Sequence, residues 1–137
     1  MSLFKGLHHF NVVVSDLEAS KEFYSQILNL ELILETEVDD SEFSRGVDLK
    51  GSRVKAAFFR LPNNDGIIEL FQFLKPRGRE LRKDQKPNDR GWGHLCFEVE
   101  DIETSYRLLS EQGVRFMSPP VTIGPRHPHS AAEYLSQ

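Results

Sequence analysis

The same pattern of apolar and polar positions occurs twice in this sequence. Each copy begins with a histidine, continues as an alternating apolar strand and ends in an aspartate that precedes a helical pattern. The two copies cover residues 9–20 and 94–105. A repeat of this kind predicts two related modules built from the same elements.

The first half of the chain predicts a β-α-β-β-β module. Apolar residues flank the turn-forming segment 62–66, which predicts a hairpin. Asp16 is a suitable N-cap for the helix, and a polar loop of undefined structure is expected up to Asp48. The predicted elements are a strand at 7–14, a helix at 17–28, a strand at 30–36 and hairpin strands at 54–61 and 67–74.

The second half repeats only part of this order. Asp101 is the expected N-cap, and Gly113 the expected C-cap, of a helix that ends near Gln112. A further strand is expected to begin at Val114 and to reach Met117. The other predicted strands of this half are at 93–99 and 131–136.

Together these elements predict an α+β fold, a single domain over residues 1–137 in which two β-α-β-β-β modules form curved mixed sheets around a central site. The first module is placed at 5–74, a charged, proline-containing linker at 75–91 and the second module at 92–137. By symmetry with the first module, the second is expected to lack its final strand.

Composition and charge narrow the function classes. Hydrophobic residues make up 39% and charged residues 28% of the chain, which is typical of a globular protein. A net charge of −4 argues against nucleic-acid binding, which needs a concentrated basic surface. No apolar run approaches the roughly 20 residues of a membrane span, and the N-terminus lacks the apolar core of a signal peptide. Because the only cysteine, Cys96, cannot form an internal disulfide, we expect a cytoplasmic protein.

The candidates for chemistry are His9, Glu69 and His94. The two histidines hold equivalent positions in the repeat, and Glu69 shares a strand face with Ile67 and Phe71. A carboxylate among apolar residues is costly to bury unless a cation or a hydrogen-bond donor offsets its charge. Two imidazoles and a carboxylate form an ordinary ligand set for zinc, nickel, cobalt, manganese or iron(II).

Each candidate also has a purely structural interpretation. A histidine on a strand is more often an ordinary surface or core residue than a ligand, and His8 beside His9 leaves open which ring faces a site. Glu69 is also compatible with a solvent-facing position. Cys96 is expected to be a small buried hydrophobic residue rather than a nucleophile.

Three stretches resemble the vicinal oxygen chelate superfamily, which includes glyoxalase I, the bleomycin resistance proteins and the extradiol dioxygenases. The resemblance implies paired modules that enclose a metal site, with ligands on the first and last strands of each module. The matching stretches are residues 9–18 with Phe23-Tyr24, residues 64–70 and residues 93–102.

The resemblance implies His9, Glu69 and His94 as metal ligands, with Glu69 also the catalytic residue that moves a proton. It implies that His8, one position off the motif, points away. The family's fourth ligand, usually a glutamate on the last strand, has no counterpart. Three residues near the end of the chain do not match that position: His127, His129 and Glu133.

We therefore expect an enzyme: a metal-dependent lyase or isomerase of the glyoxalase I type that stabilises an enediolate or enolate of a small carbonyl substrate. The enzymatic alternatives resemble methylmalonyl-CoA epimerase or an extradiol dioxygenase. The non-enzymatic alternative is a metal-free ligand-binding or antibiotic-resistance protein with an aromatic pocket lined by Phe43, Phe58, Phe71, Phe73 and Trp92. An open sheet edge favours a homodimer, and the expected partner is a small-molecule substrate rather than nucleic acid or a membrane.

Overall fold

The computed structural model describes residues 3–4, 6–62, 66–81, 84–86, 88–91 and 93–121 in full and the backbone of 134–136. The chain forms two compact units, Met1–Glu80 and Leu81–Gln137. The predicted turn residues 63–65, Trp92, the two C-terminal histidines and Glu133 lie outside the described residues.

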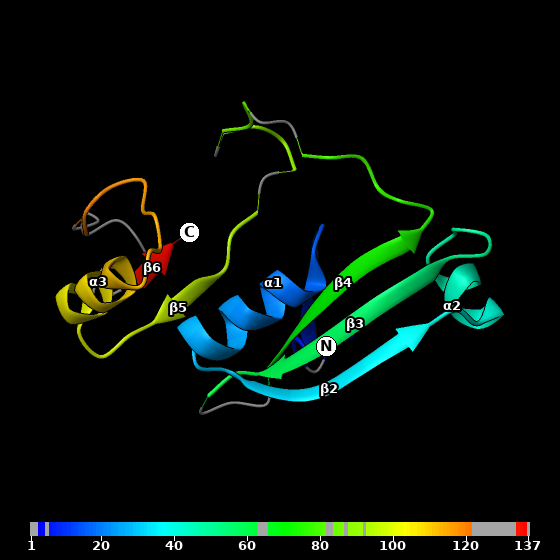
Figure 1. Cartoon of the computed structure of the whole chain (residues 1–137), viewed down its shortest axis with the longest axis horizontal. Helices are drawn as coiled ribbons and strands as arrows, with labels where there is room; N and C mark the ends of the chain where they lie inside the picture. The colour runs from blue at the N-terminus through cyan, green and yellow to red at the C-terminus, as the bar shows by residue number, and fades with distance from the viewer. Residues whose placement is uncertain are drawn as a thin grey trace. The chain divides into compact units, whose positions relative to one another are not determined.

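A four-stranded mixed sheet forms the first unit (Figure 1). Its strand order is β1-β4-β3-β2, with β1 parallel to β4 and the other pairs antiparallel. The α+β fold with a curved mixed sheet is thus confirmed. The elements are β1 (His9–Val13), α1 (Leu17–Glu22), a π-helical turn η1 (Phe23–Ile27), β2 (Glu31–Val38), α2 (Ser41–Gly46), β3 (Arg53–Arg60) and β4 (Ile67–Lys75).

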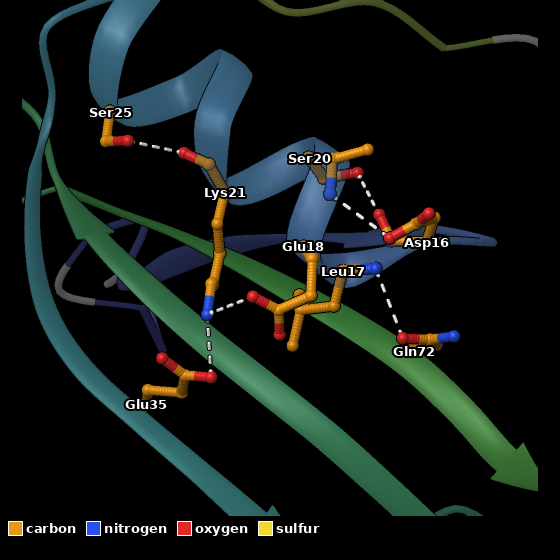
Figure 2. Close-up of polar contacts among 9 residues, drawn as sticks. Asp16, Leu17, Glu18, Ser20, Lys21, Ser25, Glu35 and Gln72 are labelled. Carbon is orange, nitrogen blue, oxygen red and sulfur yellow. Dashed lines mark hydrogen bonds and ion pairs between the residues drawn. The ribbon is translucent and has the colours of Figure 1, made fainter.

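Helix α1 packs against one face of this sheet, next to β3 and β4 (Figure 1). Gln72 on β4 joins the two elements, because its side-chain oxygen accepts a hydrogen bond from the backbone N–H of Leu17 at 3.1 Å. Figure 2 shows Lys21 of the same helix with the carboxylates of Glu18 and Glu35, each 2.8 Å from its ammonium group. Hydrogen bonds to these two carboxylates raise the pKa of Lys21.

Much of the core of the first unit lies beneath α1, whereas the buried Val54 and Ala56 have the other parity on β3 and belong to the opposite face. Phe59 pairs with Ile68 and Ala57 pairs with Leu70, so these four side chains share the face that carries Gln72 and the helix. Burial of a large apolar side chain such as these contributes about 1.5–3 kcal/mol. The fully or almost fully buried apolar residues are Leu17, Leu30, Val54, Ala56, Ala57, Phe59, Ile68 and Leu70.

Helix α2 replaces part of the polar loop that the sequence analysis expects up to Asp48. Asp40 caps it by accepting a hydrogen bond from the backbone N–H of Phe43 at 2.8 Å. The ring of Phe43 packs edge-on against Phe71 of β4, with centroids 5.8 Å apart. The sequence leaves the structure of this loop undefined, because the helix is too short to show an apolar period and is stabilised by one cap and one tertiary contact.

The second unit contains β5 (Cys96–Glu98), α3 (Ile102–Glu111) and β6 (Tyr134–Ser136), with β5 and β6 antiparallel. Asp101 caps α3 as predicted, and Gly113 after its end has a φ of +88°, a left-handed conformation that suits glycine. The predicted helix is confirmed. The strand predicted at 93–99 is much shorter, and β6 agrees with the end of the strand predicted at 131–136.

The strand predicted from Val114 to Met117 is wrong, since these residues form neither strand nor helix. The backbone N–H of Val114 instead donates to the carbonyl of Leu109 at 3.0 Å, which closes the end of α3. The ring of Phe116 packs on Tyr106 of the helix, with centroids 4.8 Å apart. This segment therefore folds back on α3 rather than pairing with a strand.

None of the helices in the described part of the chain combines the length and apolar character that a bilayer crossing demands.

Candidate metal site on the four-stranded sheet

The parallel pairing of β1 and β4 brings the first histidine and the glutamate of the sequence analysis together. Asn11 lies opposite Glu69, and His9 lies opposite Ile67 in the same register. Because side chains alternate along a strand, His9 and Asn11 share a face of the sheet with Glu69. This is the face opposite the one that α1 covers, since Gln72 has the other parity on β4.

The three polar side chains are close enough to interact directly. His9 Nε2 lies 3.7 Å from Glu69 Oε2, and the Asn11 amide donates to that same oxygen at 2.9 Å. The side chain of Glu69 is only 12% exposed, whereas that of His9 is 47% exposed. The glutamate is therefore largely withdrawn from water, and the histidine can reach a ligand in solvent.

Apolar residues surround Glu69 on the other sides. Phe58 of β3 lies opposite it in the antiparallel register, and Phe71 follows on the same face of β4. Phe71 is part of an aromatic cluster with Phe73, at 6.2 Å between centroids, and with Phe43. A nearby cation stabilises the ionised form of a carboxylate in such surroundings, because one neutral amide donor offsets little of the cost of burying its charge.

The ring of His8 contacts the ring of His9. The two Nδ1 atoms lie 2.9 Å apart and the rings are nearly perpendicular, with centroids at 5.2 Å. Either ring can be the donor in this contact. Only the arrangement in which His9 donates from Nδ1 leaves a lone pair on Nε2, the atom that faces Glu69.

His94, the second predicted histidine, belongs to the second unit. It lies just before β5 rather than within it and is exposed. Cys96 is also exposed, so the expectation that it is buried was wrong. Partial desolvation raises the pKa of its thiol, which lowers its thiolate fraction and agrees with the view that it is not a nucleophile.

The donor atoms of the first unit fit a divalent metal. An ion bound to both His9 Nε2 and Glu69 Oε2 at about 2.1 Å requires these atoms to lie no more than about 4.2 Å apart. Their separation of 3.7 Å meets this limit. Within the described residues no group of three His, Cys, Asp or Glu side chains gathers at one point, so His9 and Glu69 are two candidate ligands in the first unit.

Asn11 is the residue of this site that the sequence analysis did not single out. Its position two residues after His9 placed it on the same strand face, but only the register with β4 brings its amide to Glu69. The alternation of side chains along a strand predicts that Asn11 shares a face with His9, but it does not predict the hydrogen bond from Asn11 to Glu69.

Comparison with known proteins places the chain in a family. A model of the Glyoxalase/Bleomycin resistance protein/Dioxygenase superfamily matches residues 6–129. The lactoylglutathione lyase of Schizosaccharomyces pombe is 31% identical over 120 residues, a match that covers 85% of this chain and 39% of the lyase. The chain therefore spans well under half the length of that relative.

Two solved structures share the fold. A glyoxalase family protein from Bacillus cereus superposes with a TM-score of 0.76 at 22% identity, covering 90% of this chain and 82% of that one. A variant of a fosfomycin resistance protein from Listeria monocytogenes, in complex with Mn(II) and dihydroxypropylphosphonic acid, has a TM-score of 0.56 at 24% identity. That match covers 90% of this chain and 79% of the Listeria protein. This chain belongs to the glyoxalase/bleomycin resistance protein/dioxygenase superfamily.

Proposed function

We propose that this chain is a metal-dependent lyase or isomerase of the glyoxalase I type that acts on a small carbonyl substrate. The observation that carries the proposal is the approach of His9 Nε2 to the sheltered carboxylate of Glu69, 3.7 Å away on the neighbouring strand. The Mn(II) complex of the Listeria relative supports a divalent metal on this fold. By the repeat, we assign His94 as the third ligand, supplied by the second module of this chain or of a homodimer partner.

The protein's own residues divide the work in this proposal. His9, Glu69 and His94 would hold the ion, which would supply a Lewis acid for the negative charge that develops when a proton leaves a carbon next to a carbonyl. Glu69 takes that proton on Oε1, the carboxylate oxygen that does not face Asn11. The electron pair of the broken C–H bond moves into an enediolate, and Glu69 returns the proton to the neighbouring carbon. The result is an isomerisation that needs no outside oxidant or reductant.

The aromatic cluster supports a second candidate, a metal-free protein that binds or sequesters a ligand. Phe43, Phe71 and Phe73 are in ring contact on the face that carries Glu69, and all three are only partly buried. Such rings can hold an apolar ligand without a metal. We favour the enzyme because a pocket that only binds apolar groups has no need of a sheltered carboxylate beside a histidine.

The test is the metal content of the purified protein after exposure to zinc, nickel, cobalt, manganese and iron(II), measured by mass spectrometry. We expect one ion per site in the wild type and a large loss of bound metal in His9→Ala, His94→Ala and Glu69→Gln. Glu98→Gln is the matched control, since it removes an exposed carboxylate of β5 and leaves the proposed ligands and their contacts in place. A wild type that binds none of these ions overturns the enzymatic proposal and favours the binding protein.

Substrate assays then separate the enzymatic alternatives. The glutathione–methylglyoxal adduct tests the glyoxalase I reaction, an epimerisable acyl-CoA tests an epimerase and a catechol with oxygen tests an extradiol dioxygenase. We expect turnover of the first class only. Turnover of the acyl-CoA or the catechol by a metal-loaded protein would keep the metal site and replace the proposed reaction.

A further inference from the structure

Asn11 contacts Glu69 in a way that the proposed function does not use. We propose that Asn11 is a positioning residue, whose amide holds the Glu69 carboxylate in the orientation that binds the metal. This inference rests on the proposed function, because it concerns the same carboxylate. It adds a residue for which neither the repeat nor the ligand pattern of the sequence provides a role.

One amide nitrogen, Nδ2 of Asn11, contacts both the side chain and the backbone of Glu69. Asn11 Nδ2 donates to Glu69 Oε2 at 2.9 Å and lies 3.4 Å from the backbone carbonyl oxygen of Glu69. An amide NH₂ has two hydrogens, so it can serve both acceptors at once. The main-chain contact anchors the amide to β4, and the side-chain contact then restricts the rotamer of the glutamate.

The hydrogen bond leaves the metal-binding capacity of the carboxylate intact. Each carboxylate oxygen has two lone pairs, so Oε2 can accept from Asn11 with one and face His9 with the other. The same oxygen is the atom that lies 3.7 Å from His9 Nε2. Asn11 therefore selects the glutamate rotamer in which oxygen and imidazole nitrogen are close, and partners of this kind orient metal ligands in many sites.

An ordinary cross-strand pair is the simpler explanation of the contact, and the next pair along the strands offers a comparison. Val13 lies opposite Phe71 in the same parallel register, on the same face, and is 59% exposed. A polar pair that only joins β1 to β4 would affect stability much as the Val13 pair does. A positioning residue would also affect the affinity for metal, which Val13 has no means to change.

The test measures the binding of Mn(II) and Zn(II) to metal-free protein by titration calorimetry, beside the Tm of each metal-free variant in EDTA. The variants are Asn11→Leu, which is of similar size without a donor, and Asn11→Val, which suits a strand if the leucine disturbs folding. Val13→Ala is the matched control. We expect the Asn11 variants to bind metal about 10- to 100-fold more weakly, and Val13→Ala to stay near the wild-type affinity.

The outcomes separate this inference from the proposed function. Wild-type metal affinity in a folded Asn11 variant, with or without a lower Tm, would reduce Asn11 to a cross-strand partner and overturn the inference alone. A wild type that binds neither ion here and none of the five ions of the metal-content test would overturn both. An equal loss of affinity in Val13→Ala would show a general effect of β1 and would also count against a role specific to Asn11.

Discussion

The two copies of the repeat begin alike and end in different structures. In both, an aspartate caps the helix: Asp16 accepts from the backbone N–H of Ala19 at 3.1 Å, and Asp101 accepts from that of Thr104 at 2.6 Å. The first copy then joins a four-stranded sheet with a buried core. In the second, no residue of the described part is fully buried, and the strand is three residues long.

The difference shows what a local pattern can and cannot determine. The capping aspartate acts on neighbouring backbone N–H groups, so it works in both copies. The site depends on a strand that the pattern does not contain. His9 becomes part of a site because β4 lies beside β1 and carries Glu69, whereas His94 lies ahead of the short β5 in its own unit.

The largest effect is expected from Glu69→Gln, which keeps the size of the side chain and removes its charge and basicity. If this residue moves the proton, kcat should fall by about 10²- to 10⁴-fold. The control is Glu98→Gln, an exposed glutamate on β5 of the second copy. Steady-state kinetics in excess metal measures both, and the metal content of each sample is determined so that kcat refers to the loaded fraction. Equal losses of kcat in the two variants, or a near-normal kcat in the Glu69 variant, would contradict a catalytic role specific to Glu69.

A second test compares the packing of the two units. Phe59 is fully buried between Ile68 and the ring of Tyr24, so Phe59→Ala should lower the free energy of unfolding by about 3–5 kcal/mol. Phe97 on β5 is only half-buried, and Phe97→Ala should cost less than half as much. Urea denaturation followed by circular dichroism measures both losses. A larger loss at Phe97 would contradict the location of the core in the first unit.

Much of the first unit could be predicted from the sequence because its apolar residues recur with the period of a strand or a helix. The hairpin strands alternate regularly, and capping aspartates mark the helix starts. Helix α2 was missed because its stability comes from the packing of Phe43 on Phe71, residues far apart in the sequence. The strand predicted from Val114 is absent for a similar reason, because the ring of Phe116 packs on Tyr106 of α3. The sequence indicated His9 and Glu69 as candidates, whereas their contact and the contact of Asn11 depend on the register between β1 and β4.

A smaller effect is expected at the helix cap of the first copy. Asp16→Ala removes the acceptor for the Ala19 backbone N–H and should cost about 1 kcal/mol of stability. Asp16→Asn keeps a capping oxygen and should stay close to the wild type. Thermal and urea unfolding of the two variants check the pair. An asparagine variant as unstable as the alanine variant would show that charge, and not capping, matters at this position.

The smallest effect concerns pH and the cap of the second copy. Hydrogen bonds from the side chain and backbone of Thr104 lower the pKa of Asp101. A carboxylate whose pKa is lower in the folded state stabilises α3 above its unfolded pKa of about 3.9, and this contribution is lost as pH falls through the folded value. NMR titration of the Thr104 amide should show a midpoint below that unfolded value. A midpoint at or above it would contradict the cap.

The proposed metal site consists of His9 and Glu69 of the first unit, with His94 as the third ligand. It can be tested by a Zn(II) titration of protein labelled with ¹⁵N at its histidines, followed through the ring nitrogen resonances. We expect the Nε2 resonance of His9 to shift and one ring nitrogen of His94 to shift with it, both complete at one equivalent of zinc per site. Unchanged resonances of both histidines in an excess of zinc would contradict this site.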